Sequence, residues 1–326
     1  MANKKSNNRF ILILNIFFEG ISLYCRNLDT FIKYMFFPVL GQIFGLFIIF
    51  AINYLFVLHL PEIVSKYPVF DNILLTLTLL LICVAPGFMI FCKAFYDLII
   101  AYGSLNSMVA VSRGGRMRNK PIDTKTHDNI LKKRLVSYIF LWLILSVIVL
   151  IGTFPLFLII FGAAAVFLVF VFQVFMLEDV SPVSAIKRSI YLVKGNYLAT
   201  TFLILLSVLL TYYIIPMLFV WLFEKINAVQ YLVIPVNAYV NKLAVPAIST
   251  VVDNAIESVN LNGYNLSFSV KTLLDNLKIG NLIVEGIIMF AVTLYLLPLR
   301  SAWFTLLYKI YDAEKTDDLR RKEGRK

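Results

Sequence analysis

The sequence has few of the residues that usually perform chemistry. It contains two histidines: His59 ends an apolar stretch and His127 lies in a polar loop, so neither belongs to a credible Ser-His-Asp set. No group of His, Cys and carboxylate residues has the spacing of a metal site. The Gly114-Gly115 pair lacks the spacing of a phosphate-binding loop. The sequence therefore predicts no catalytic, cofactor-binding or metal-ligating residue, and we expect a protein that is not an enzyme.

Arg300 is the most unusual charged residue. It follows Pro298 by two positions inside an apolar stretch, and its guanidinium cannot lose its charge. A charge inside a membrane span costs about 2.5–3.5 kcal/mol on insertion scales, which invites a functional interpretation. Asp97 and Glu178 are expected at a similar depth, and one of them is the predicted partner. Two interpretations stay open: an ion pair that holds helices together, which we favour, and part of a path for a small solute.

Basic residues gather just before several apolar stretches. In residues 184–194, Ile186, Ile190 and Val193 share one helical face, with Lys187 and Lys194 a quarter turn away. A helix of this kind lies in the headgroup plane of a membrane. The candidate contacts to anionic lipid are Lys132, Lys133, Arg134, Lys187, Arg188 and Lys194. The alternative is that these charges only set the orientation of the chain in the membrane.

The elements that must position these residues are predicted to be six transmembrane helices. The chain is 60% hydrophobic and 15% charged, with a mean hydropathy of +0.84, whereas soluble domains are about 25% charged. The stretch Leu135–Leu177 is broken only at residues 152–155, and a bilayer core needs about 20 apolar residues, so it predicts two spans. The predicted spans are Tyr34–Leu58, Ile73–Cys92, Leu135–Phe154, Pro155–Leu177, Tyr197–Phe223 and Gly286–Leu307.

The distribution of basic residues predicts the orientation of these spans. The N-terminal segment, residues 93–134, residues 178–196 and the C-terminal end carry 25 of the 30 Lys and Arg residues. Basic residues favour the cytoplasmic side, so both termini should be cytoplasmic, and His59 and His127 should lie on opposite sides. The same segments carry 12 of the 19 acidic residues, so their net charge is +13 and that of the outer segments is −2. Nucleic-acid binding is disfavoured, because the aromatic residues lie in the apolar spans rather than among the basic clusters.

These patterns predict one all-α, polytopic membrane domain over residues 1–326. Cys25, Cys83 and Cys92 make a disulfide framework improbable. Gly41 and Gly45 form a helix-packing motif in the first span. We expect a retained N-terminal interfacial helix (1–30), five spans (31–223), an extracytoplasmic helical loop (224–285), a sixth span (286–311) and a basic cytoplasmic tail (312–326).

Two segments resemble a known membrane family. Residues 178–196, from Glu178-Asp-Val-Ser-Pro to Leu-Val-Lys-Gly-Asn196, and residues 298–308 resemble the membrane domain of some bacterial glycerophosphodiester phosphodiesterases and of their stand-alone relatives. The resemblance implies a six-span inner-membrane protein. It does not carry over the hydrolase activity, since we expect no catalytic barrel after residue 326. More weakly, residues 18–40 resemble the N-terminal segment of a bacterial sulfate-permease family.

The sequence thus favours a non-enzymatic, multi-pass protein of the cytoplasmic membrane, acting as a scaffold or accessory in the cell envelope or lipid system. Its predicted partner is the bilayer, including anionic lipid, and no nucleic acid is expected. The alternative is a permease or channel for a small solute or anion. The ligand and the oligomeric state are left open.

Overall fold

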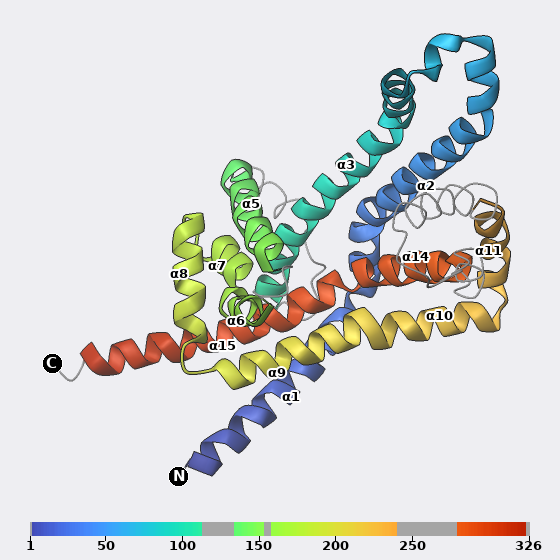
Figure 1. The fold of residues 1–326 in the computed structure, drawn as a ribbon. Coiled ribbons are helices and arrows are strands. Elements are labelled where there is room, and N and C mark those ends of the chain that lie inside the picture. The colour runs from blue at the N-terminus through green and yellow to red at the C-terminus, as the bar shows by residue number, and fades with distance from the viewer. Residues whose placement is uncertain (1, 113–133, 153–157, 240–278, 324–326) are drawn as a thin grey trace, which may run out of the picture. The chain divides into compact units, whose positions relative to one another are not determined.

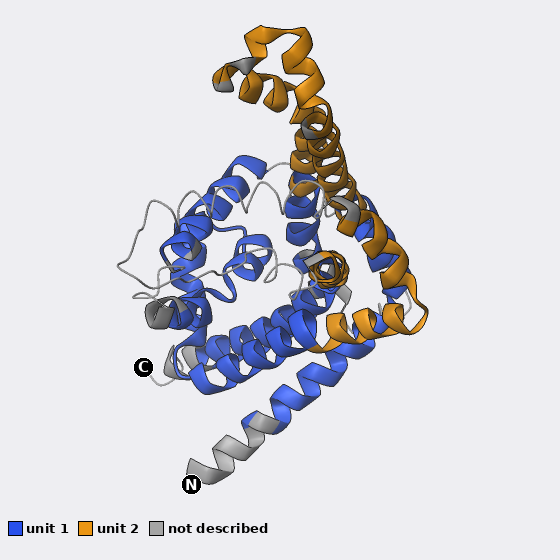
Figure 2. Cartoon of the chain, turned by 45° about the vertical axis from the view of Figure 1, so that its right-hand side comes forward, with its two compact units in different colours: residues 1–38, 96–213, 294–326 blue, residues 39–95, 214–293 orange. Residues whose placement is uncertain are grey.

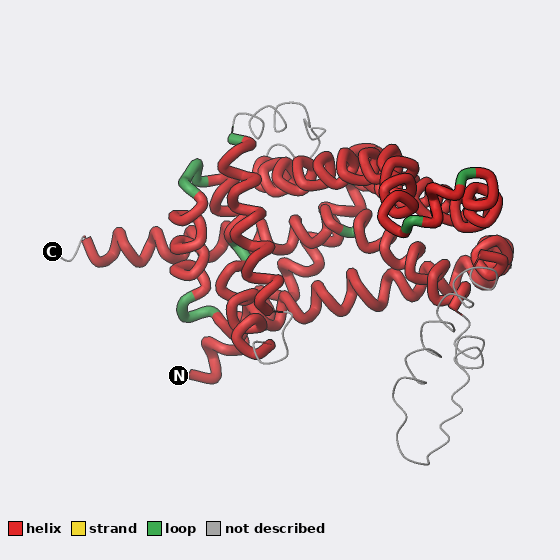
Figure 3. Tube along the Cα trace, turned by 45° about the horizontal axis from the view of Figure 1, so that its top comes forward, coloured by secondary structure: helices red, strands yellow, loops and turns green. Residues whose placement is uncertain are grey.

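A computed structural model describes residues 2–112, 134–152, 158–239 and 279–323 of the chain. It is 93% helical, and the described residues form no strand. Figure 3 shows these residues as helices joined by short turns. The prediction of an all-α protein is confirmed.

The helices are labelled in Figure 1. In chain order they are α1 (Ala2–Arg26), α2 (Leu28–Lys66), η1 (Pro68–Asp71), α3 (Ile73–Ser112), α5 (Leu135–Gly152), α6 (Leu158–Leu168), α7 (Val171–Leu177), α8 (Pro182–Val193), α9 (Tyr197–Val208), the π-helical segment η3 (Leu209–Ile214), α10 (Ile215–Lys225), α11 (Ala228–Tyr239), α14 (Ile279–Tyr295) and α15 (Leu297–Glu323).

Four helical stretches among the described residues are long and apolar enough to cross a membrane. They are Leu28–Phe56, Leu74–Asn106, Tyr197–Lys225 and Gly280–Asp317. Large apolar side chains remain exposed along them, such as Phe37 at 76% and Leu198 at 89%, as expected of a surface whose solvent is lipid. These stretches contain predicted spans five and six and cover nearly all of predicted spans one and two. Predicted spans three and four correspond to shorter apolar helices, Leu135–Ile148 and Gly162–Leu177.

The chain divides into two compact units, coloured separately in Figure 2. Unit 1 comprises residues 1–38, 96–213 and 294–326, and unit 2 comprises residues 39–95 and 214–293. The boundaries fall inside α2, α3, η3 and α14 rather than in linkers. The predicted single domain over the whole chain stays a prediction.

The predicted fourth span is interrupted between α6 and α7. Phe170 has φ −96° and ψ 4°, outside the α region. Its backbone N–H donates to Ser189 Oγ at 3.2 Å, and the Ser189 hydroxyl donates to the Phe167 carbonyl at 2.7 Å. A side chain from α8 thus satisfies the backbone groups that the break exposes, which is a recognised cause of helix interruption.

Prolines account for two other irregularities. A proline ring clashes with the carbonyl four residues earlier and lacks an N–H. Pro298 therefore ends the ladder of α14, and the predicted sixth span becomes α14 and α15 with a turn at Leu296. Pro216 lies two residues after the end of the π-helical segment η3, whose wider turn accommodates the missing hydrogen bond in the predicted fifth span.

The core of unit 1 includes a close contact between α1 and α15. Trp303 is fully buried, and its indole Nε1 donates to the Phe17 carbonyl at 3.0 Å while its ring stacks on the Phe17 ring at 5.2 Å. Gly20 makes this contact possible, because a Cβ at that position would lie 2.3 Å from Trp303 Cδ1. A helix that the sequence predicts at the membrane interface is thus packed against the apolar N-terminal part of α15.

Unit 2 contains the glycine motif of the predicted first span. A Cβ at Gly41 would lie 2.7 Å from the Ala94 Cβ, and one at Gly45 would lie 2.7 Å from the Phe91 backbone nitrogen. Both glycines therefore lie against α3 within the chain. Of the predicted outer loop, only 226–239 and 279–285 are described beyond the end of α10, and there Val229 and Val233 pack on Val284. The rest of that loop lies outside the described residues.

Candidate functional site

The short helix α8 has two chemically distinct faces. Its start is fixed by Pro182 in the first turn and by the Ser181 hydroxyl, which accepts from the Ser184 N–H at 3.4 Å. One face is buried and consists of small and apolar side chains (Ala185, Ser189, Leu192 and Val193). The other face is exposed and mixes apolar and basic side chains (Val183, Lys187, Ile190, Tyr191 and Lys194).

The exposed face of α8 has the composition of a helix at a membrane interface. Val183 is 53% and Ile190 is 41% exposed, and two lysines share their face. Apolar side chains can enter the acyl boundary while lysine stems carry their ammonium groups to the phosphates. The sequence pattern had placed Val193 on the apolar face, but it is fully buried against the protein, and Val183 takes part in the exposed face instead.

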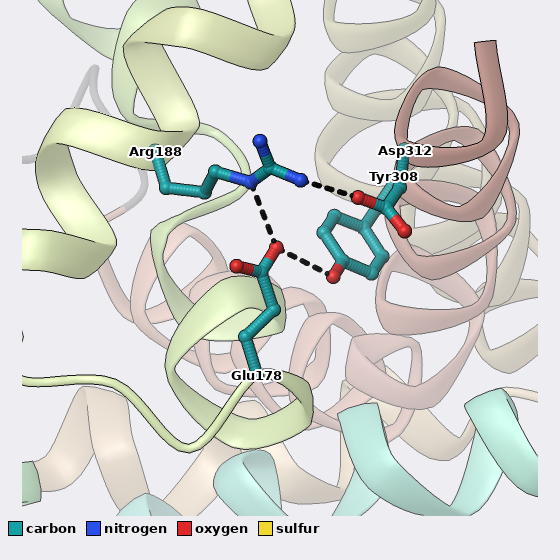
Figure 4. A network of polar contacts seen from close by, with 4 residues as sticks. All are labelled: Glu178, Arg188, Tyr308 and Asp312. Atoms are coloured by element: carbon teal, nitrogen blue, oxygen red, sulfur yellow. Dashed lines mark hydrogen bonds and ion pairs between the residues drawn. The ribbon is translucent and has the colours of Figure 1, made fainter. Parts of the chain in front are cut away.

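An ion-pair network attaches α8 to two other helices (Figure 4). Arg188 Nε donates to Glu178 Oε1 at 3.1 Å, and its Nη2 donates to Asp312 Oδ1 at 2.6 Å. The Tyr308 hydroxyl donates to the same Glu178 oxygen at 2.9 Å. Burial alone would lower the pKa of Arg188, but the hydrogen bonds and charges of the two carboxylates outweigh it and raise that pKa above its ordinary value.

This network changes the role of two predicted residues. The guanidinium of Arg188, a candidate lipid contact, is held by two carboxylates and is only partly exposed. Glu178, a candidate partner of Arg300, forms an ion pair with Arg188. The network therefore joins the end of α7, the middle of α8 and the C-terminal half of α15.

Arg134 forms a second attachment at the start of α5. Its Nη1 donates to the Phe175 carbonyl at 2.7 Å and lies 2.9 Å from Asp179 Oδ1, and its Nη2 donates to the Val180 carbonyl at 2.6 Å. The guanidinium also lies 4.1 Å from the centre of the Phe175 ring. Asp179 has a positive φ of 53°, a conformation that aspartate tolerates better than most residues. Arg134 thus holds the turn between α7 and α8.

Two cations converge on the end of α8. Gly195, with φ +91°, turns the chain there. Arg9 of α1 donates to its carbonyl at 2.8 Å, and Lys315 of α15 donates to the Lys194 carbonyl at 3.0 Å. Helix C-termini attract cations because their last carbonyls lack partners. The end of α8 is therefore tied to both α1 and α15.

A buried polar group lies between α3, α7 and α15. Asn106 Oδ1 accepts from Gln173 Nε2 at 3.2 Å and from the Ser301 hydroxyl at 2.7 Å, while Asn106 Nδ2 donates to the Tyr102 carbonyl at 3.1 Å. Asn106, Gln173 and Ser301 are all fully buried. Sequence reasoning missed this group because it considered only charged residues, although uncharged amides in apolar stretches are also costly and informative.

Arg300 lies beside the π-helical segment. Its Nη1 donates to the Tyr212 hydroxyl, and its guanidinium carbon lies 4.5 Å from the centre of the Tyr212 ring. Tyr102 interacts electrostatically with both residues. Pairing of Arg300 with Asp97 stays a prediction. Lys132 and Lys133 lie outside the described residues, so their predicted lipid contacts stay predictions as well.

Searches for related proteins and for metal sites add no assignment. No group of three His, Cys, Asp or Glu residues in the described part of the chain could hold a metal ion. No protein-family model matches the chain, and no match is found among curated proteins or among solved structures.

Proposed function

We propose that the chain is a scaffold or accessory protein of the cytoplasmic membrane whose basic cytoplasmic face engages anionic lipid. It would have six spans, with α5 as the third and α6 and α7 together as the fourth, and both termini in the cytoplasm. The concentration of basic residues in the four predicted cytoplasmic segments supports this orientation. The proposal assigns no chemical reaction to the protein.

The observation that carries the proposal is the exposed face of α8. Val183 and Ile190 lie on it beside Lys187 and Lys194. The ion pairs of Arg188 and the clamp of Arg134 supply the rigidity that a fixed lipid-binding face requires. The segment 178–196, which contains α8, is also one of the two segments that resemble the membrane domain of the bacterial phosphodiesterase family.

The proposal is tested on the full-length protein in nanodiscs that contain phosphatidylglycerol and phosphatidylcholine. A basic residue near an anionic surface contributes about 1 kcal/mol, so the Lys187→Gln, Lys194→Gln double variant should retain phosphatidylglycerol at least about fivefold less well by native mass spectrometry. The matched control is Lys66→Gln with Lys225→Gln, which removes the same charge from the predicted outer face. Equal retention by the two double variants would overturn the proposal.

A permease or channel is the second candidate, and the Arg300–Tyr212 contact favours it. An arginine on an aromatic ring at a π-helical segment is an arrangement found at functional sites. The test is sulfate flux into proteoliposomes. Flux that the Arg300→Gln variant loses and the Lys66→Gln variant keeps would favour transport, and flux no greater than in protein-free liposomes would count against it.

A further inference from the structure

Helix α15 carries a polar stripe along one side. Ser301, Thr305, Tyr308 and Asp312 are spaced by four, three and four residues, so they share a helical face. With a rise of 1.5 Å per residue the stripe is about 17 Å long. Its far end is the network of Tyr308 and Asp312 with Glu178 and Arg188. Its near end is the Asn106 group.

Near the Asn106 end of the stripe, two atoms, one on α7 and one on α15, have no hydrogen-bond partner within the described residues. They are Gln173 Oε1 and Thr305 Oγ1, and both side chains are fully buried. A buried polar atom left unpaired costs about 1–3 kcal/mol, and native structures rarely contain one that no water or ligand satisfies. Gln173 is one hydrogen bond from Asn106, and Thr305 is one turn from Ser301, which also bonds Asn106. Both residues therefore adjoin the Asn106 group.

Thr305 differs from the buried threonines Thr200 and Thr211 in how its hydroxyl is bonded. A threonine in a membrane helix usually satisfies itself by donating to the carbonyl four residues earlier. Thr200 does so to the Asn196 carbonyl at 3.0 Å, and Thr211 does so to the Ser207 carbonyl at 2.8 Å. The Thr305 hydroxyl does not form this hydrogen bond. Its hydroxyl is therefore available to another molecule.

We propose that Gln173 and Thr305 bind a small neutral molecule that donates and accepts hydrogen bonds, either water or a solute of the alcohol or amide class. The molecule donates to Gln173 Oε1, which is an acceptor only. Asn106, Gln173, Ser301 and Thr305 supply amides and hydroxyls and no carboxylate, which disfavours a cation. Asn106 Oδ1 already accepts two hydrogen bonds and has no capacity left for a metal ion. This site is independent of the lipid-binding face.

The substitution Thr305→Val, which keeps the shape of the side chain, tests the site through the direction in which stability changes. If Thr305 Oγ1 has no partner, Thr305→Val removes an unsatisfied group and leaves stability unchanged or raised. If it binds a molecule, Thr305→Val lowers the apparent Tm of the full-length protein in nanodiscs by about 2–4 °C. Thr200→Val is the reference for a buried hydroxyl with known partners.

Two measurements identify the occupant on the wild-type protein. Water-edited solid-state NMR should transfer magnetisation from water to the Gln173 side-chain amide if water is bound. Added acetamide should raise the Tm of the wild type but not of Thr305→Val if a solute is bound. Either result supports the site. Unchanged or raised Tm in Thr305→Val, with neither water transfer nor an acetamide shift, would overturn it.

Discussion

Replacing Gly20 by alanine should separate α1 from α15, although the same change stabilises most helices. Alanine is favoured over glycine in a helix by about 1 kcal/mol. At this position the new Cβ would lie 2.3 Å from Trp303 Cδ1 and 2.6 Å from its Nε1. Real Cβ contacts do not approach so closely, so the indole must move.

The cost can be worked out from what the indole would lose. Trp303 is fully buried, donates to the Phe17 carbonyl and stacks on the Phe17 ring. Overpacking of a core site costs about 1–3 kcal/mol, and the hydrogen bond contributes about 1 kcal/mol more. After subtraction of the helical gain, Gly20→Ala should destabilise the protein by about 1–3 kcal/mol.

The assay is thermal unfolding in nanodiscs, with Gly162→Ala as the matched control. Gly162 is exposed in α6, and a Cβ there would contact nothing within 4 Å, so its variant should be neutral or more stable. Trp303→Leu should reduce the effect of Gly20→Ala in a double-mutant cycle, because the clashing ring is gone. If Gly20→Ala is as stable as Gly162→Ala, the packing of α1 on α15 is refuted.

Three further predictions concern unit 1. Arg188→Met should lower stability by about 1–2 kcal/mol by leaving two carboxylates unpaired, and adding Glu178→Gln should restore part of the loss; equal Tm values for the single and double variants would contradict the network. Arg134→Lys keeps the charge but loses the planar fork that reaches two carbonyls, so it should lower Tm, whereas Lys187→Arg should not. Burial, helped by the charge of Cys25, raises the pKa of Tyr24 to about 12. The neutral phenol, which donates to the Tyr295 carbonyl, therefore stabilises the fold fully below pH 10 and loses this effect toward pH 12. The Tm of the wild type should fall more steeply over that range than the Tm of Tyr24→Phe, and parallel curves would refute the assignment.

Hydropathy and proline positions predict much of the helical framework. The four long apolar stretches, which correspond to predicted spans one, two, five and six, can be predicted from the length of their apolar runs. Pro216 and Pro298 indicate where helices become irregular. The interruption at Phe170 could not be predicted, because no glycine or proline is present there. Its cause is Ser189, which follows 19 residues later in the chain.

Charge patterns locate the functional face but not the partners within it. The basic character of α8 is visible in the sequence. The pairing of Arg188 with Asp312 joins residues 124 positions apart, which no local pattern can indicate. Asn106 and Gln173 could have been noticed as costly amides in apolar stretches, but their union with Ser301 depends on packing between three helices.

The most direct test of the account is the depth and the side of α8 in a membrane. In a variant whose Cys25, Cys83 and Cys92 are replaced, a nitroxide at position 187 in nanodiscs and in sealed vesicles reports both. The account predicts a label about 5–10 Å from the acyl boundary that reductants reach only from the cytoplasmic side. A label that is reduced from the outer face, or that lies in bulk water away from lipid, would contradict the account.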